Sequence, residues 1–178
     1  MWERKELGDI CEILDKFRKP ITKKNRVGGE FPYYGATGIV DWVDSYLFDE
    51  TLVLVGEDGA KWAAGEKTAF VIEGKSWVNN HSHVLRPKSN LVLHKWLAYY
   101  FTSIDLNPWV TGLTVPKLNQ AQLRSIPIPL PPLVEQQRIV AKLDAAFSEI
   151  DKCLAKVDIN QKNIYYLFEK CLDEIPND

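Results

Sequence analysis

The chain has 178 residues, of which 46% are hydrophobic, and a formal net charge of −2. This length suits one compact domain of about 130 residues with an appended helix. No apolar run approaches the roughly 20 residues of a membrane span and the N-terminus lacks a secretory signal pattern, so we expect a soluble cytoplasmic protein. The three cysteines have no C-x-x-C spacing, which predicts reduced, packed thiols.

Short strands dominate the first part of the chain. Residues 7–14 mix short apolar steps, which predicts a helical turn leading into a strand. Residues 16–30 contain proline and a glycine pair and predict a basic loop. Strands are expected over 32–40, which includes a tight turn, and over 51–55 and 69–72.

Helices are expected further along the chain. Residues 77–87 predict a strand pair around a polar bend, and 93–102 have helical spacing. Residues 112–118 are expected to form a loop into a short helix, and 126–130 to be extended, because residues before proline avoid helical geometry. Together these elements predict a globular α+β head over residues 1–130.

A long helix with a continuous apolar seam is predicted after the proline run at 131–132. The seam residues alternate in steps of three and four: Val140, Leu143, Phe147, Ile150, Leu154, Val157, Ile164, Phe168, Cys171 and Ile175. Gln161 alone interrupts the series. An isolated helix cannot bury such a seam, so residues 131–178 are expected to form a coiled coil. Gln161 is predicted to fix the register of pairing near its centre.

The charge is unevenly distributed between these two parts. Residues 1–130 carry 16 Lys and Arg against 15 Asp and Glu, a balance of +1, and residues 131–178 carry 6 against 9, a balance of −3. Residues 16–26 hold six cations and no acid: Lys16, Arg18, Lys19, Lys23, Lys24 and Arg26. Such a cluster attracts phosphate, although a solvated loop is the alternative. The weak total charge indicates that the protein does not bind DNA tightly alone.

Motifs for catalysis are sparse. The chain has no G-x-x-x-x-G-K-[ST] phosphate loop and no G-x-G-x-x-G after a strand. Glu57, Asp58 and Lys61 are close in sequence but lack the acid-x-Lys spacing of a nuclease centre. His81 and His83, on one face of a strand, need a third ligand to bind a metal, and structural roles are favoured for them. We therefore expect no catalytic site, no metal and no cofactor.

Polar segments are better suited to binding. Residues 79–83 read N-N-H-S-H, in which Asn suits bidentate contact with adenine and a hydrogen-bonded turn is the alternative. Tyr33, Tyr34 and Thr37 lie near two glycines that allow close approach of a ligand, although Tyr33 can equally be a core residue. Residues 111–117 precede a helix N-terminus, where phosphate binds favourably.

Six motifs occur in a fixed order along the chain. They are LGDI at 7–10, YGATGI at 34–39, GEDGA at 56–60, NNHSHVLRP at 79–87, GLTVPKLN at 112–119 and IPIPLPPLVEQQRIV at 126–140. In this order they resemble the specificity (S) subunit of type I restriction–modification systems, across essentially the whole chain. The last motif, followed by a long helix, is the most specific.

The resemblance implies a non-enzymatic DNA-specificity module. Residues 1–130 are then a target recognition domain for one half of a split DNA site, and residues 131–178 a spacer and dimerisation helix that also docks methyltransferase (modification) subunits. A restriction (translocase/nuclease) subunit is a further expected partner. S-adenosylmethionine, ATP and Mg²⁺ are expected to belong to these partners.

One departure from the family pattern matters. A full member has two recognition domains and two helices, whereas this chain has one of each, as in a half-length form, natural or truncated. Two copies are then expected to pair about a two-fold axis and to recognise an interrupted palindrome. Antiparallel helices of about 43 residues span roughly 65 Å, which limits the separation to about 19 base pairs.

Site residues are predicted within this frame. Phosphate contacts are assigned to Lys23, Lys24, Arg26 and Lys117. Base contacts are assigned to Tyr34, Thr37, Asn79, Asn80, His81, His83, Thr111 and Thr114. One alternative is a protein-interaction or decoy subunit that pairs through its helix and recognises no DNA. Another is a stand-alone nuclease, which requires metal-dependent cutting by the chain itself.

Overall fold

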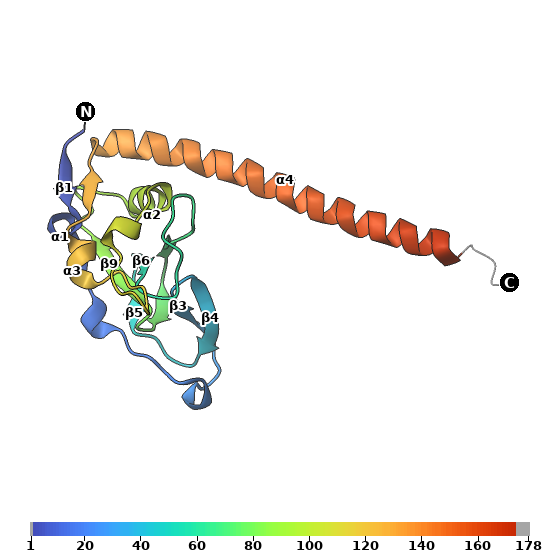
Figure 1. Ribbon diagram of the computed structural model, residues 1–178, viewed down its shortest axis with the longest axis horizontal. Coiled ribbons are helices and arrows are strands. Elements are labelled where there is room, and N and C mark those ends of the chain that lie inside the picture. Colours follow the sequence, from blue (N-terminus) through green and yellow to red (C-terminus); the bar gives the residue numbers. More distant parts are fainter. Residues whose placement is uncertain (1, 174–178) are drawn as a thin grey trace. The chain divides into compact units, whose positions relative to one another are not determined.

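The computed structural model describes residues 2–173 and divides into two compact units (Figure 1). The first, Met1–Gln137, is called the head, and the second, Arg138–Asp178, is called the stalk. The head contains strands and short helices, and the long helix α4 (Leu133–Asp173) starts in the head and makes up the described stalk. Among the described residues, no helix has the combination of length and apolar character that a membrane span needs. The α+β prediction with a long C-terminal helix is confirmed.

The first sheet of the head is antiparallel throughout. Its strand order is β2 (Cys11–Ile13), β9 (Ser82–Pro87), β6 (Leu52–Gly56) and β7 (Ala69–Ile72). Helix α2 (His94–Ser103) packs on β6 and β7 through a buried face that includes Trp96, Leu97 and Phe101. Because β6 is covered on both faces, its four apolar residues are fully buried, and its sequence is a continuous apolar run rather than an alternating one.

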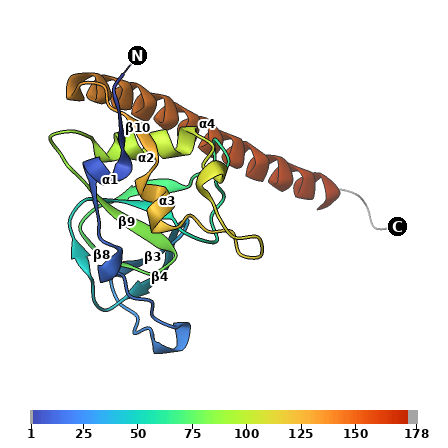
Figure 2. The same cartoon turned by 60° about the vertical axis from the view of Figure 1, so that its left-hand side comes forward.

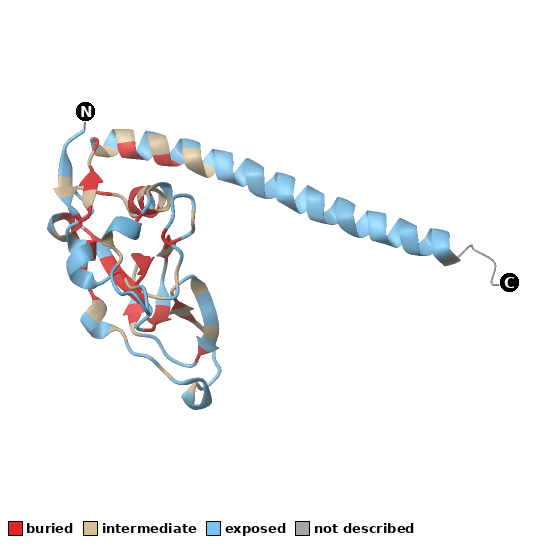
Figure 3. Ribbon diagram, in the orientation of Figure 1, coloured by how far each residue is buried: buried red, intermediate tan, exposed pale blue. Residues whose placement is uncertain are grey.

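The second sheet of the head also has four strands. Its order is β4 (Gly38–Val43), β3 (Phe31–Gly35), β8 (Lys75–Val78) and β5 (Phe48–Asp49), with β3 and β8 parallel. The largest part of the core combines side chains of both sheets, such as Leu54 and Val84 from the first and Phe48 and Val78 from the second. Figure 3 shows this buried interior of the head.

The expectation that residues 77–87 form two strands paired with each other is wrong. Both strands exist, but β8 pairs with β3 and β5 in the second sheet, whereas β9 pairs with β2 and β6 in the first. The bend at residues 79–81 therefore carries the chain from one sheet to the other. Alternation along a strand consequently does not relate His81, in the bend, to His83, in β9.

The remaining elements of the head are short (Figure 2). They are β1 (Arg4–Glu6), α1 (Leu7–Ile10), η1 (Asp15–Phe17), η2 (Lys23–Asn25), η3 (Asn107–Trp109), α3 (Gln120–Arg124) and β10 (Pro127–Pro129). The predicted turn before β2, the helix over 93–102 and the short helix after the 112–118 loop are confirmed. Sequence reasoning did not foresee that β10 pairs antiparallel with β1, next to the chain start.

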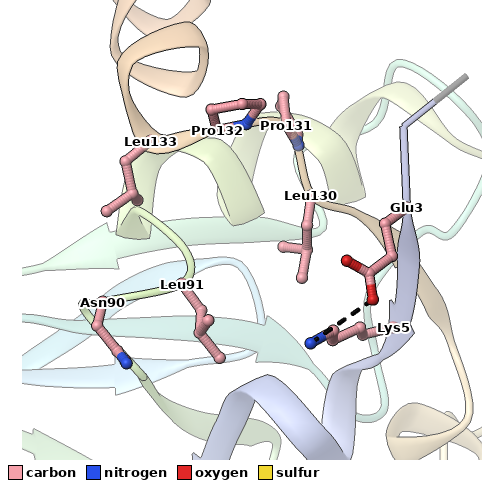
Figure 4. Close-up of a pocket in the computed structure, with 8 residues that line it drawn as sticks. All are labelled: Glu3, Lys5, Asn90, Leu91, Leu130, Pro131, Pro132 and Leu133. Carbon is pink, nitrogen blue, oxygen red and sulfur yellow. Dashed lines mark ion pairs between the residues drawn. The ribbon is translucent and has the colours of Figure 1, made fainter.

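The first turn of α4 belongs to the head because of one buried side chain. The Gln136 amide accepts the Leu93 N–H at 3.0 Å and donates to the Leu91 and Pro131 carbonyls, each at 2.9 Å. The compact head accordingly runs to Gln137, past the boundary expected at residue 130. Beside this turn is a hollow of about 260 Å³ (Figure 4), lined by Glu3, Lys5, Asn90, Leu91, Leu130, Pro131, Pro132 and Leu133.

Candidate nucleic-acid interface

Polar segments that are distant in the sequence meet where the two sheets adjoin. Asn79 N–H donates to the Tyr34 carbonyl at 3.1 Å, and the Ser82 hydroxyl donates to the Gly35 carbonyl at 2.8 Å. Glu57 N–H donates to the His81 carbonyl at 2.8 Å. The turn after β3, the bend 79–81 and the segment after β6 are thus joined by hydrogen bonds. The sequence predicted a tight turn within 32–40, a polar bend within 77–87 and the end of a strand near residue 56 as separate features, and the fold brings them together.

The loop at residues 111–118 is tied to the same place. Leu118 N–H donates to the Glu57 carbonyl at 2.9 Å, and Lys117 forms an isolated bridge with Asp58. Thr111 and Lys117 exchange both of their backbone hydrogen bonds, at 2.9 and 2.7 Å, which makes the loop a tight hairpin. In Figure 2 this hairpin leaves the body of the head beside α3.

The hairpin conformation depends on a glycine. Gly112 has a φ of +95°, and a Cβ at this position would lie 2.4 Å from the Val115 carbonyl oxygen. Thr111 Oγ1 accepts a hydrogen bond from Asn119 Nδ2 at 2.6 Å, while the Thr114 side chain is exposed at the tip. Leu113, which sequence reasoning did not select, is fully exposed beside it.

A buried ionic network supports these loops from inside. Glu57 is 7% exposed and accepts a hydrogen bond from Arg18, and its other carboxylate oxygen lies 2.8 Å from Lys117 Nζ. Arg18 also donates to the Ser82 carbonyl at 2.7 Å and lies 3.4 Å from the Asp15 carboxylate. Buried charges persist only when they are paired in this way. Arg18 and Asp15 were missed as site residues because sequence spacing does not reveal their partners.

His83 is at the centre of this network and is not accessible to a ligand. It is 0% exposed, with Nε2 2.6 Å from the Leu118 carbonyl and Nδ1 2.6 Å from Asp15 Oδ2. A carbonyl can only accept, so Nε2 donates, and an ionised Asp15 requires Nδ1 to donate as well. The base contact predicted for His83 is therefore corrected: its ring joins Asp15 to Leu118 inside the head.

Asp15 is held in its ionised form by these neighbours. Burial acts to raise the pKa of its carboxyl, but hydrogen bonds from His83, the Val84 N–H and Gln120, with the charge of His83, lower the pKa below its usual value. The Val84 N–H and Gln120 Nε2 lie 2.9 and 3.0 Å from Asp15. Asp15 therefore ties η1, β9 and α3 together.

Asp15, Glu57 and His83 are the one group among the described residues that could hold a metal. Donor atoms of Asp15, Glu57 and His83 lie within 4.8 Å of one another. Arg18 already pairs with both carboxylates, and both ring nitrogens of His83 are engaged. A divalent ion would have to displace Arg18, so the arrangement fits an internal ionic network better than a metal centre.

The bend 79–81 divides into a structural residue and two exposed ones. Asn79 is 6% exposed, and its Oδ1 accepts the His81 N–H at 2.8 Å. This is the hydrogen-bonded turn that was the alternative for Asn79, and its predicted base contact is corrected accordingly. Asn80 and His81 are exposed, as is Thr37 in the adjoining turn. The His81 ring is hydrogen-bonded through Nδ1 to Asp58.

The basic segment 16–26 is anchored rather than loose. Trp77 Nε1 donates to the Lys19 carbonyl at 2.6 Å, and the Ile21 N–H donates to the Tyr33 hydroxyl at 2.9 Å. Tyr33 is buried, as its core alternative required. Lys23 and Lys24 are exposed on η2. The segment therefore presents these two ammonium groups from a fixed backbone.

Three predicted contact residues already have partners in the head. Arg26 pairs with Asp41 at 2.9 Å and lies 4.4 Å above the Tyr33 ring, and its hydrogen bond to Asp41 raises the pKa of the guanidinium. The hydrogen bond to Glu57 likewise raises the pKa of Lys117. Tyr34 is half-buried against Phe70, and burial raises its pKa. Any contact of these groups with DNA competes with these interactions.

The predicted seam lies on α4. Val140 and Leu143 occupy its first two positions, and the side chains from Phe147 onward are exposed: Phe147 44%, Ile150 51%, Leu154 57%, Val157 59%, Ile164 66% and Phe168 62%. Gln161 and Cys171 are also exposed, and Ile175 lies outside the described residues. An exposed apolar seam of this length is typical of a helix that pairs with another.

Comparisons with known proteins identify the family. Residues 1–161 match the model of the type I restriction modification DNA specificity domain. A putative type I restriction enzyme specificity subunit of Haemophilus influenzae is 39% identical over 143 residues, which cover 80% of this chain and 37% of that protein.

Solved structures agree at the level of the fold. A structure from a study of type I restriction–modification complex assembly has a TM-score of 0.72 at 21% identity, over 97% of this chain and 45% of that one. The S subunit from M. genitalium has a TM-score of 0.69 at 16% identity, over 98% and 47%. The chain spans less than half the length of these relatives. It belongs to the type I restriction modification DNA specificity domain family.

Proposed function

We propose that the head binds duplex DNA in a sequence-specific manner, as a non-catalytic specificity subunit acting in the cytoplasm. The observation that carries the proposal is the convergence of exposed polar groups from the turn after β3, the bend 79–81 and the 111–118 hairpin, joined by backbone hydrogen bonds. Base contacts require polar side chains held at fixed positions, which this arrangement provides. Thr37, Asn80, His81, Thr111 and Thr114 are the proposed contacts.

Phosphate contacts are proposed for the exposed lysines. Lys23 and Lys24 are exposed on an anchored backbone. Arg26 and Lys117 remain candidates, but each must share its charge with a carboxylate of the head. The head then relies on few exposed cations, in keeping with the +1 balance of residues 1–130, and its affinity for DNA alone is expected to be low.

Two copies are proposed to pair through the exposed seam of α4. A two-fold axis presents two identical heads, so the recognised sequence is an interrupted palindrome. Antiparallel pairing holds the heads apart. The 41 residues of α4 span about 62 Å at 1.5 Å per residue, an upper bound of about 18 base pairs between half-sites.

Catalytic activities are proposed to come from partner proteins. Methyltransferase (modification) subunits and a restriction (translocase/nuclease) subunit would act at the site that the paired heads select, bringing their own S-adenosylmethionine, ATP and Mg²⁺.

The second candidate function is a protein-interaction or decoy subunit that pairs through α4 without binding DNA. The carboxylates that engage Arg26 and Lys117 favour it, because they reduce the free positive charge.

One pair of measurements tests the proposal. We expect the purified chain to be a particle of about 40.8 kDa, twice its 20.4 kDa mass, by light scattering. With a methyltransferase subunit it should retard duplexes from a random pool, and the selected sequence, or the motif methylated in cells, should be an interrupted palindrome. An asymmetric motif would contradict the homodimer. A monomer that binds no duplex, with or without the methyltransferase, would favour the decoy.

A further inference from the structure

His81 is exposed and yet held in one orientation. Its N–H donates to Asn79 Oδ1 at 2.8 Å, and its carbonyl accepts the Glu57 N–H at 2.8 Å. Its ring is hydrogen-bonded through Nδ1 to Asp58, although the side chain is 52% exposed. Exposed side chains ordinarily keep their rotamer freedom, and fixing one costs free energy without gaining burial. A fixed, exposed imidazole is therefore suited to contact a ligand.

Asp58 determines which ring nitrogen carries the proton. An ionised carboxylate can only accept, so Nδ1 donates to it. In the neutral ring Nε2 is then an acceptor, and in the charged ring it is a donor. The charged groups around this pair are Lys117, 3.6 Å from Asp58 and 2.8 Å from Glu57, and Arg18, which pairs with Glu57 and donates to the Asn80 carbonyl at 3.4 Å.

An acceptor at this position selects among bases. In the major groove the exocyclic amino groups of adenine and cytosine are the donors, whereas guanine and thymine present acceptors. A neutral His81 ring therefore pairs with adenine N6 or cytosine N4 and disfavours guanine or thymine at the same position. Within the described chain, hydrogen bonds occupy the backbone of His81 and Nδ1, and Nε2 is the atom left for this contact.

We propose that His81 is a specificity-determining residue that accepts a hydrogen bond through Nε2 from the exocyclic amino group of adenine or cytosine. Asp58 is the positioning residue that fixes its tautomer. The inference rests on the proposed DNA binding of the head and adds the base chemistry of one contact.

The test uses the full chain with its methyltransferase subunit and the selected duplex. Each adenine is replaced in turn by purine, and each cytosine by 2-pyrimidinone, which remove only the amino group. At one position per half-site we expect a roughly tenfold loss of affinity for the wild type and no loss for His81→Ala. Asp58→Asn, which can donate to Nδ1, should also lose the discrimination. His94→Ala, a histidine on α2 that bonds to the Thr51 carbonyl, should retain it.

The outcomes separate this inference from the function on which it rests. If the wild type and His81→Ala bind DNA and respond alike to every analogue, the role of His81 is contradicted while DNA binding stands. If the wild type binds no duplex, both fail. Should His81→Ala prove unfolded by circular dichroism, the folded Asp58→Asn variant decides.

Discussion

The head and the stalk treat buried and exposed surface in opposite ways. The head encloses charged groups, such as Glu57 at 7% and His83 at 0% exposure, and provides each with partners from several elements. The stalk exposes large apolar side chains, among them Leu154 at 57% and Phe168 at 62%. Water solvates charges well and apolar surface poorly, so both arrangements have a cost that must be offset elsewhere.

The difference indicates where each part obtains its stability. The buried charges of Glu57 and His83 have their partners within the head, so these groups need no partner from a second chain. The described seam residues of the stalk from Phe147 onward are exposed, and a helix in water depends mainly on packing of its apolar face. The head is therefore expected to be an independent folding unit, and the stalk an obligate pairing element.

The largest expected effect comes from a charge in the seam. Leu154→Glu places a carboxylate where two helices meet, and we expect the 40.8 kDa particle to become a 20.4 kDa monomer. Lys156→Glu, on the same helix but outside the seam, is the matched control and should remain paired. The unfolding of the head should be unaffected by either. Light scattering checks the mass, and a dimeric Leu154→Glu variant would show that the seam is not the interface.

A substitution inside the head tests whether the buried ionic network stabilises the fold. His83→Leu removes one charged hydrogen-bond partner of Asp15, which keeps Arg18, and leaves the Leu118 carbonyl without its side-chain donor. These two losses are expected to cost about 3–5 kcal/mol of unfolding free energy. Urea unfolding of the chain measures this, with His94→Ala as the control that should lose much less. Pairing through α4 should persist. A loss of under about 1 kcal/mol would mean that the network is not needed for stability.

Exposed lysines of the head should behave differently from its buried charges. Replacing Lys23 and Lys24 together by alanine removes two groups from the surface without breaking a buried pair. We expect affinity to fall roughly tenfold for all duplexes alike and the salt slope to become shallower by about 1–2, with unfolding unchanged. Titrations at several salt concentrations measure this. A change in sequence preference with the salt slope intact would reassign these lysines to base contacts.

Acid should weaken the head through Asp15. Because its folded pKa is lowered, the unfolded chain binds more protons below the usual carboxyl range. The stabilisation is present above about pH 4, the usual unfolded value, and is lost as the pH falls through the lowered folded pKa. Asp15→Asn should be less stable at neutral pH but lose less on acidification. Urea unfolding between neutral pH and pH 3 checks this, and parallel curves for the two proteins would contradict it.

Sequence patterns predicted what depends on local periodicity. The apolar run 51–55 corresponds to β6, the helical spacing of 93–102 to α2 and the heptad seam to α4, because each pattern consists of residues that are close together in the sequence. The bend 79–81 was located correctly, but the sheets that it connects were not, since pairing between strands that are far apart in the sequence leaves no local signal. The family motifs mark the segments that meet in the head without indicating how they meet.

The ionic network could not be predicted in the same way. Asp15 and His83 are 68 residues apart, and an aspartate that will be buried has the same local pattern as one that will be exposed. His83 was taken for a ligand contact because it stands in a polar run. One signal was usable. Val84 and Leu85 follow His83 directly in β9, and a histidine next to apolar strand residues is close to the core.

Gln161 offers the smallest and finest test of the contrast. A polar residue in an apolar seam lowers the stability of pairing and fixes the register, so Gln161→Leu should strengthen dimerisation by about 1 kcal/mol and allow slippage. Cys171 reports the register: parallel, in-register helices place the two copies of Cys171 face to face, whereas antiparallel pairing centred near residue 158 separates them by about 39 Å. The wild type, if antiparallel, should form no disulfide under mild oxidation. Any disulfide that appears only in Gln161→Leu would show that Gln161 specifies the orientation, and equal disulfide formation in both proteins would mean that orientation is set elsewhere in the seam.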